Sequence, residues 1–297
     1  MKFKQSIYFF FSALLALGLA SCGSSSKDDQ NKNSEEFKEA EGALKSQIQQ
    51  VVYNIPSPSE IPYLIQSTGA EFNEGLLNPR SNVDKYTTRS DKAALNLGVY
   101  TADIGYLSSY DKTQQSIDYL SAAKVLADNL GIIGSFDADI LRRFEANISN
   151  KDSLTYLLDQ TIKRTESFLN DDSRNKLSAL VVAGSFIEGL HISTGLINTY
   201  PRNLLPDDKR NLVLTPLIRV VLEQKKSVTE LLKMMKSVDQ TDPVKSIVAD
   251  LTALENTYKE LNIEEQIKNN RADLVLSDKN LVEVTQIVGR LRKAITE

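Results

Sequence analysis

The sequence predicts an all-α fold, an antiparallel bundle of about nine or ten helices. After residue 35, apolar side chains recur every three to four positions, which is the period of a helix with one buried face. Strand signals are nearly absent, since no alternating run of β-branched residues exceeds four and no Asn-Gly or Asp-Gly turn occurs. The connections are mostly short, which places consecutive helices side by side.

The first elements follow from proline and glycine stops. Apolar periodicity predicts a helix at residues 35 to 53, which Pro56 ends because proline disfavours helix at the preceding residue. A short helix at residues 60 to 68 begins after the capping Ser59. Residues 75 to 88 show no period and are predicted to form a loop.

Five longer helices follow. Ser90 is predicted to cap the first of them, and a glycine-containing connection follows the second. They are predicted at residues 90 to 110, 113 to 130, 136 to 148, 151 to 169 and 174 to 199.

The last third begins with a helix near residue 206, and Pro216 either kinks it or starts a fresh helix to about residue 238. Pro243 starts the next helix, to about residue 260. A last helix is predicted at residues 277 to 296, and residues 274 to 276 could form one short extended piece.

The N-terminal segment has the three parts of a secretory signal. Lys2 and Lys4 precede an almost wholly apolar run at residues 7 to 19, and small residues follow. The run would be roughly 20 Å long as a helix, which is short for a hydrocarbon layer of about 30 Å. Residues 1 to 21 are therefore predicted to be a cleaved signal peptide.

The motif Leu19-Ala20-Ser21-Cys22 resembles the lipobox of bacterial lipoproteins. This resemblance implies a diacylglycerol on Cys22, cleavage before it and acylation, for example with palmitate, of the new amino end. Such acyl chains anchor a protein stably in a membrane. The alternative is ordinary secretion with a free thiol. Cys22 is the sole cysteine, so the chain can form no internal disulfide and no thiolate metal site.

Residues 22 to 35 carry almost no apolar side chain and are predicted to be a flexible tether. Within them, Lys27-Asp28-Asp29 is similar to the export tag that sends some Bacteroidetes lipoproteins to the cell surface. Display on the surface and on the periplasmic face of the outer membrane both stay open. Residues 36 to 297 are predicted to form the helical domain, with a division into two packed halves near residue 170 as an option.

Composition excludes some partners. Without residues 1 to 21 the chain loses Lys2, Lys4 and no acidic residue, which leaves a net charge of about −6 and no basic footprint for nucleic acid. The absence of tryptophan and the 7% aromatic content argue against sugar binding.

Two helical segments, residues 94 to 110 and 180 to 197, are apolar nearly all round and rich in small residues. Such helices are buried on every face, and their glycines indicate a close approach of another backbone. Each contains one acid, Asp103 or Glu188, and buried acids are rare unless they are paired, protonated or functional.

Glu188 and His191 have the Glu-x-x-His spacing of the di-iron helices of ferritin-like proteins. The chain has one histidine, so neither a metal site nor a cofactor is predicted. The structural interpretation pairs His191 with Glu188 or with a neighbouring helix. It also satisfies the two acids through tyrosine hydroxyls, such as those of Tyr100, Tyr106 or Tyr110, or through the amide of Asn96.

The alternative interpretation places the two acids and His191 in a pocket between the helices, for a small ligand or for acid and base catalysis. Its candidate catalytic residues are Glu188, His191 and Asp103, and Asn96 and Tyr100 join them as candidate ligand-binding residues.

The tether, the stretch IPSPSEIPYLIQSTGAEFNEGLLNP and the stretch LNLGVYTADIGYLSSYD together resemble a group of uncharacterised Bacteroidetes-type helical lipoproteins. The resemblance implies a helical body in the cell envelope, most simply at the outer membrane. The first hypothesis is a non-enzymatic lipoprotein that binds an envelope protein or a small ligand. The second is a hydrolase that uses Glu188, His191 and Asp103.

Overall fold

The computed structural model divides into two compact units, Met1–Ala43 and Leu44–Glu297, and every helix named below belongs to the second unit. The structure describes residues 42–44, 46, 66, 70–132, 142–143, 146, 175–201, 205–261, 268–269, 271–276 and 279–297.

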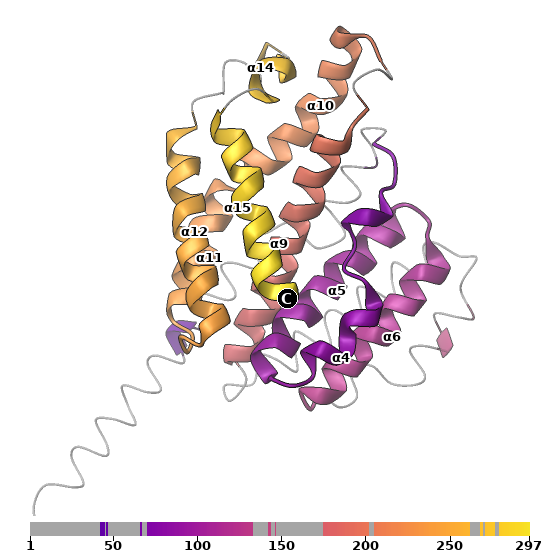
Figure 1. Cartoon of the computed structure of the whole chain (residues 1–297), viewed down its shortest axis with the longest axis vertical. Coiled ribbons are helices and arrows are strands. Elements are labelled where there is room, and N and C mark those ends of the chain that lie inside the picture. The colour runs from indigo at the N-terminus through magenta and orange to yellow at the C-terminus, as the bar shows by residue number, and fades with distance from the viewer. Residues whose placement is uncertain are drawn as a thin grey trace, which may run out of the picture. The chain divides into compact units, whose positions relative to one another are not determined.

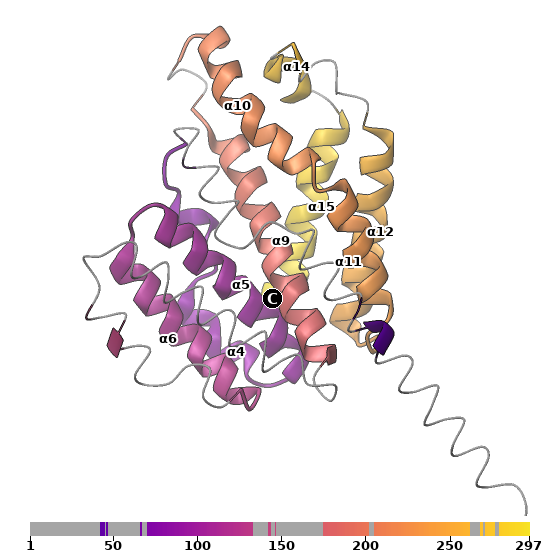
Figure 2. The same cartoon turned by 180° about the vertical axis from the view of Figure 1, so that it is seen from behind.

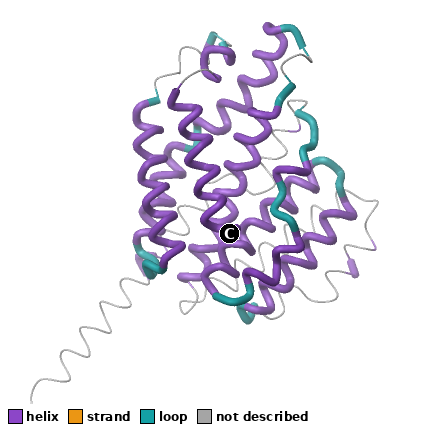
Figure 3. The backbone as a smooth tube through the Cα atoms, in the orientation of Figure 1, coloured by secondary structure: helices purple, strands orange, loops and turns teal. Residues whose placement is uncertain are grey.

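This part of the chain is all-α, which confirms the predicted fold class (Figure 3). The helices of at least 12 residues are α5 (Ser90–Ser109), α6 (Thr113–Asn129), α9 (Asn175–Thr199), α10 (Asp207–Leu222), α11 (Lys225–Lys236), α12 (Asp242–Glu260) and α15 (Lys279–Thr296). The short elements are the 3-10 turns η1 (Glu74–Leu76) and η2 (Arg80–Asn82) and the helices α4 (Val83–Tyr86) and α14 (Ala272–Leu276). The described ranges therefore contain slightly fewer long helices than the nine or ten that the sequence predicts.

Helix α9 lies at the centre of this arrangement (Figures 1 and 2). On one side it packs against α5, which in turn packs against α6. On the other side it contacts α15, and α15 packs against α12. The three-residue connection between α5 and α6 makes these two helices antiparallel neighbours, as predicted from short loops.

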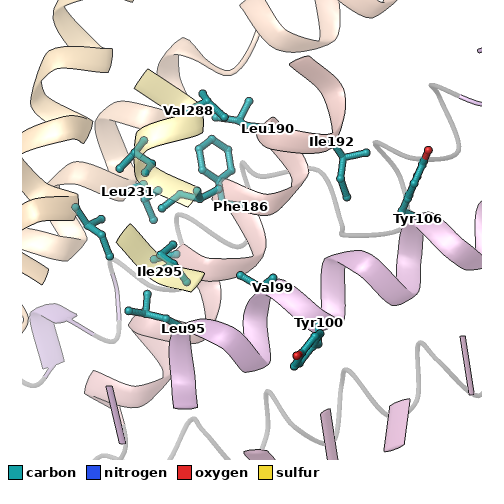
Figure 4. Close-up of a cluster of buried hydrophobic side chains, with 14 of the residues drawn as sticks. Leu95, Val99, Tyr100, Tyr106, Phe186, Leu190, Ile192, Leu231, Val288 and Ile295 are labelled. Carbon is teal, nitrogen blue, oxygen red and sulfur yellow. The ribbon is translucent and has the colours of Figure 1, made fainter. Parts of the chain in front are cut away.

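The side chains of α9 are apolar or small on nearly all faces, and the packing covers them. Phe186 and Leu190 face Val288 and Leu231, while Ile192 lies on the side of α5 (Figure 4). Among the described residues, α9 is the one helix long and apolar enough to cross a membrane, but 72% of its apolar window is buried inside the protein. This burial is typical of a core helix.

The backbones of α5 and α9 touch at two glycines. A Cβ on Gly184 would lie 1.9 Å from the carbonyl oxygen of Leu95, and a Cβ on Gly98 would lie 2.0 Å from that of Val181. Neither distance is compatible with a side chain, so only glycine permits this crossing. The close backbone approach predicted for the two apolar helices is confirmed.

Two expectations in the last third of the chain are wrong, a fresh helix from Pro216 to about residue 238 and an extended piece at residues 274 to 276. Helix α10 continues through Pro216 to Leu222, and α11 begins at Lys225, after Gln224, whose side chain donates to the Val220 carbonyl at 3.1 Å. Proline removes the hydrogen bond to the carbonyl of Leu212, a residue on the exposed face of α10. Residues 274 to 276 are helical rather than extended. Ala272 and Val275, three residues apart, are both buried and form one face of this short helix.

Two further corrections concern the segment before α5. Residues 75 to 88 are not a plain loop, because they contain η2, α4 and the end of η1. The Oδ1 atom of Asn73 caps η1 by accepting a hydrogen bond from the backbone N–H of Gly75 at 3.0 Å. Ser90 does not cap α5: the cap residue is Arg89, whose side chain pairs with Asp91 at 2.7 Å.

Several predicted features lie mostly or wholly outside the described residues. They are the signal peptide, Cys22, the tether, the helices at 35 to 53, 60 to 68, 136 to 148 and 151 to 169, and the division near residue 170.

Candidate functional site

Asp103 of α5 and Glu188 of α9 meet in the core, where both side chains are 0% exposed. Asp103 follows Gly98 on α5, and Glu188 follows Gly184 on α9, so each acid lies about one helical turn beyond the glycine at which the two helices cross. The Asp103 Oδ2 atom accepts a hydrogen bond from the backbone N–H of Asn78 at 3.2 Å. The Glu188 Oε2 atom accepts one from Nε of Arg292, on α15, at 3.3 Å. Three helices and one turn segment thus meet at this carboxyl pair.

The two carboxyl groups also act on each other, since each is among the causes of the other's pKa shift. Burial raises the pKa of Asp103 well above its usual range, and the nearby charge of Glu188 raises it further. Burial also raises the pKa of Glu188, although Arg292 opposes that effect. Burial alone would lower the pKa of Arg292, but Glu188 and Asp103 together raise it, so the guanidinium stays charged.

A layer of neutral hydrogen bonds surrounds the pair and fastens the end of α15. The Asn96 amide donates to the carbonyls of Lys92 and Ile295, at 3.0 and 2.9 Å. The Tyr86 hydroxyl donates to the Thr296 carbonyl at 3.0 Å and lies 3.2 Å from Oδ1 of Asn78. Two carbonyl oxygens of the final turn of α15, those of Ile295 and Thr296, are therefore satisfied by side chains from other elements.

The polar residues expected to satisfy the acids have other partners. Tyr100 donates to the carbonyl of Pro79 at 3.1 Å, and Tyr110 donates to that of Ala70 at 2.6 Å. Tyr106 accepts from the backbone N–H of Asn73 at 2.8 Å. Asn96 bonds α15 rather than either carboxylate. The prediction that these four residues pair with the acids is therefore wrong, because a backbone N–H and an arginine from other elements are in their place.

His191 is part-buried on α9, and no hydrogen bond joins its ring to Glu188, both residues lying in the described part. Pairing between these two residues is thus wrong, although they share a helix face. Burial and then the positive charge of Arg292 lower the pKa of His191 to about 4. The imidazole is therefore neutral near pH 7.

Arg292 and Asn78 are the members of this cluster that sequence reasoning missed. Arg292 lies four residues after Val288 and three before Ile295, two buried positions of α15. An arginine at such an inward position of an amphipathic helix was the available signal. The chemistry of the cluster is charge pairing: among the described residues, no group of His, Cys, Asp and Glu could hold a metal ion.

Comparisons with known proteins add no relative: no family model, curated protein or solved structure matches the chain.

Proposed function

We propose that this chain is a lipid-anchored protein of the bacterial cell envelope whose helical body binds an envelope protein or a small ligand without catalysing a reaction. The observation that carries the proposal is Leu19-Ala20-Ser21-Cys22, a lipobox-like motif that ends a 13-residue apolar run and contains the chain's sole cysteine. Its acyl chains would hold the body at the outer membrane through the tether at residues 22 to 35.

The geometry of the carboxyl pair favours a structural role over hydrolysis. A general acid or base must reach the substrate, but Asp103 and Glu188 are 0% exposed and already bonded to protein groups. Glu188 bonds Arg292 rather than the neutral His191, so the carboxylate does not orient the ring or assist it as a base. These observations support the binding interpretation over the hydrolase.

Labelling with palmitate tests the anchor directly. The full-length gene is expressed in a bacterial host beside a Cys22→Ser variant and a matched Ser21→Ala variant, which keeps the cysteine. Wild type and Ser21→Ala should take up label and sediment with outer-membrane vesicles, whereas Cys22→Ser should do neither. An unlabelled wild-type protein that washes off membranes freely would refute the proposal.

The non-catalytic role is tested with Glu188→Gln and His191→Phe. Under the proposal, these variants fold less stably but keep whatever ligand or partner co-purifies with the wild type. Variants that fold as stably as the wild type and lose binding or turnover would favour the hydrolase alternative.

A further inference from the structure

The carboxyl pair has two oxygens with a donor and two without one. Asp103 Oδ2 accepts from Asn78, and Glu188 Oε2 accepts from Arg292. Within the described part of the chain, Asp103 Oδ1 and Glu188 Oε1 are buried and accept no hydrogen bond from an N–H or hydroxyl group. A buried carboxylate oxygen without a donor is strongly unfavourable, so both orphan oxygens need an explanation.

The charges around the pair do not balance two carboxylates. The described groups that act on it are the Arg292 guanidinium and the hydroxyls of Tyr86, Tyr100 and Tyr119. Burial raises the pKa of each tyrosine, so these hydroxyls are neutral. His191, on the neighbouring turn of α9, is neutral as well. One positive charge therefore faces two acids.

One added proton would pair both orphan oxygens and balance the charge, although Nη2 of Arg292, which is also buried without a partner, would stay unpaired. Placed between Asp103 Oδ1 and Glu188 Oε1, it gives each orphan oxygen a partner and leaves one negative charge against Arg292. Like-charged carboxyls in contact are known to hold a single proton in this way. Because the pair belongs to α5 and α9 and its counter-ion to α15, such a proton would lie at the junction of the three helices.

We propose that Asp103 and Glu188 share one proton at neutral pH, and that this proton is a latch that holds α5, α9 and α15 together and opens when the pair loses it. The inference concerns the body alone and does not depend on the lipid anchor. The unfolded chain ionises both carboxyls above their ordinary pKa of about 4. Unfolding near neutral pH therefore releases the proton, and the latch weakens as the pH rises.

Infrared spectroscopy of the folded protein at pH 7 detects the proton through the C=O stretch of an un-ionised carboxylic acid. Wild type should show this band with a shift in D2O, and so should the control Asp84→Asn, which changes an exposed aspartate. Asp103→Asn and Glu188→Gln should each abolish it. No band in the wild type would overturn the proposal, since both acids would then be ionised. A band that survives in Glu188→Gln would also overturn it, because the proton would belong to Asp103 alone.

Equilibrium unfolding as a function of pH tests the latch. The amide that Asp103→Asn introduces would donate an N–H to Glu188 at every pH, so this variant serves as a latch that cannot open. Between pH 5 and the pH at which the pair ionises, the unfolding constant of wild type relative to Asp103→Asn should rise by about tenfold per pH unit. Parallel profiles would overturn the latch. If Asp103→Asn does not fold, the slope for Glu188→Gln and the wild-type infrared band decide the question.

Discussion

Replacing Gly184 with alanine should disrupt the junction of α5 and α9. The new Cβ would lie 1.9 Å from the Leu95 carbonyl oxygen and 2.8 Å from its carbonyl carbon, whereas real Cβ contacts essentially never fall below 3.0 Å. The two helices must therefore separate by about 1 Å, which is enough to lose a quarter to a half of the dispersion energy at the contacts that open. Overpacking typically costs about 1–3 kcal/mol and sometimes more, and the helix propensity gained offsets about 1 kcal/mol.

We expect Gly184→Ala to lower the free energy of unfolding by about 2 kcal/mol, the upper end of the overpacking cost less the propensity gained, measured by urea denaturation followed by circular dichroism. Gly289→Ala is the matched control, because its Cβ would meet nothing within 4 Å on the exposed side of α15. That variant should gain up to about 1 kcal/mol.

A second glycine makes the prediction stricter. A Cβ on Gly98 would meet the Val181 carbonyl oxygen at 2.0 Å and the Ser185 nitrogen at 2.6 Å, across the same contact. One separation of the helices relieves both clashes, so the double variant should lose less than the sum of the single losses, with a coupling of at least about 0.5 kcal/mol. A loss below about 1 kcal/mol for Gly184→Ala, or full additivity, would refute the close crossing.

Three other variants probe the core and its edges by the same unfolding assay. Glu188→Gln leaves Arg292 without its carboxylate and should lower the free energy of unfolding by about 3 kcal/mol. Asp103→Asn keeps that ion pair and should cost clearly less, and equal losses would contradict this ranking. His191 has a pKa of about 4 when folded and about 6.5 when unfolded, so the free energy of unfolding of the wild type should fall by up to about 3 kcal/mol as the pH falls from about 6.5 to about 4. His191→Gln should lack this loss. If the variant loses as much stability in acid as the wild type, the ring is not buried in its neutral form. Pro216→Ala restores a backbone donor at an exposed position of α10 and should stabilise the protein by about 1 kcal/mol or more, and no gain would mean that the helix tolerates the proline without cost.

The helices that could be predicted are those whose evidence is local. Residues 113 to 130 and 174 to 199 carry their period and their stop signals in sequence, and they match α6 and α9 closely. Gly98 and Gly184 could be interpreted because a glycine inside an all-apolar helix has few explanations other than close packing. The fresh helix expected at Pro216 was wrong, because proline inside a helix need not end it where water can reach the carbonyl that it leaves unpaired.

The acids of the candidate site could be found, but most of their partners could not. Asp103 and Glu188 stand out because an isolated acid in an apolar helix is rare. Arg292 lies 104 residues after Glu188, and Asn78 lies 25 residues before Asp103, so only the folded chain brings them to the pair. His191 shows the opposite error, since proximity along a helix suggested a bond that Glu188 makes elsewhere.

The central position of α9 determines the order in which parts of the chain can fold. The face of α9 that receives α15 has no cover until the last part of the sequence has been synthesised, because the contact spans 104 residues. Until then this 25-residue apolar helix exposes apolar surface that can bind other unfinished chains. Chains cut short before α15 should therefore aggregate rather than persist as smaller folded bodies, and a chaperone that shields this one helix would raise the yield of the whole protein.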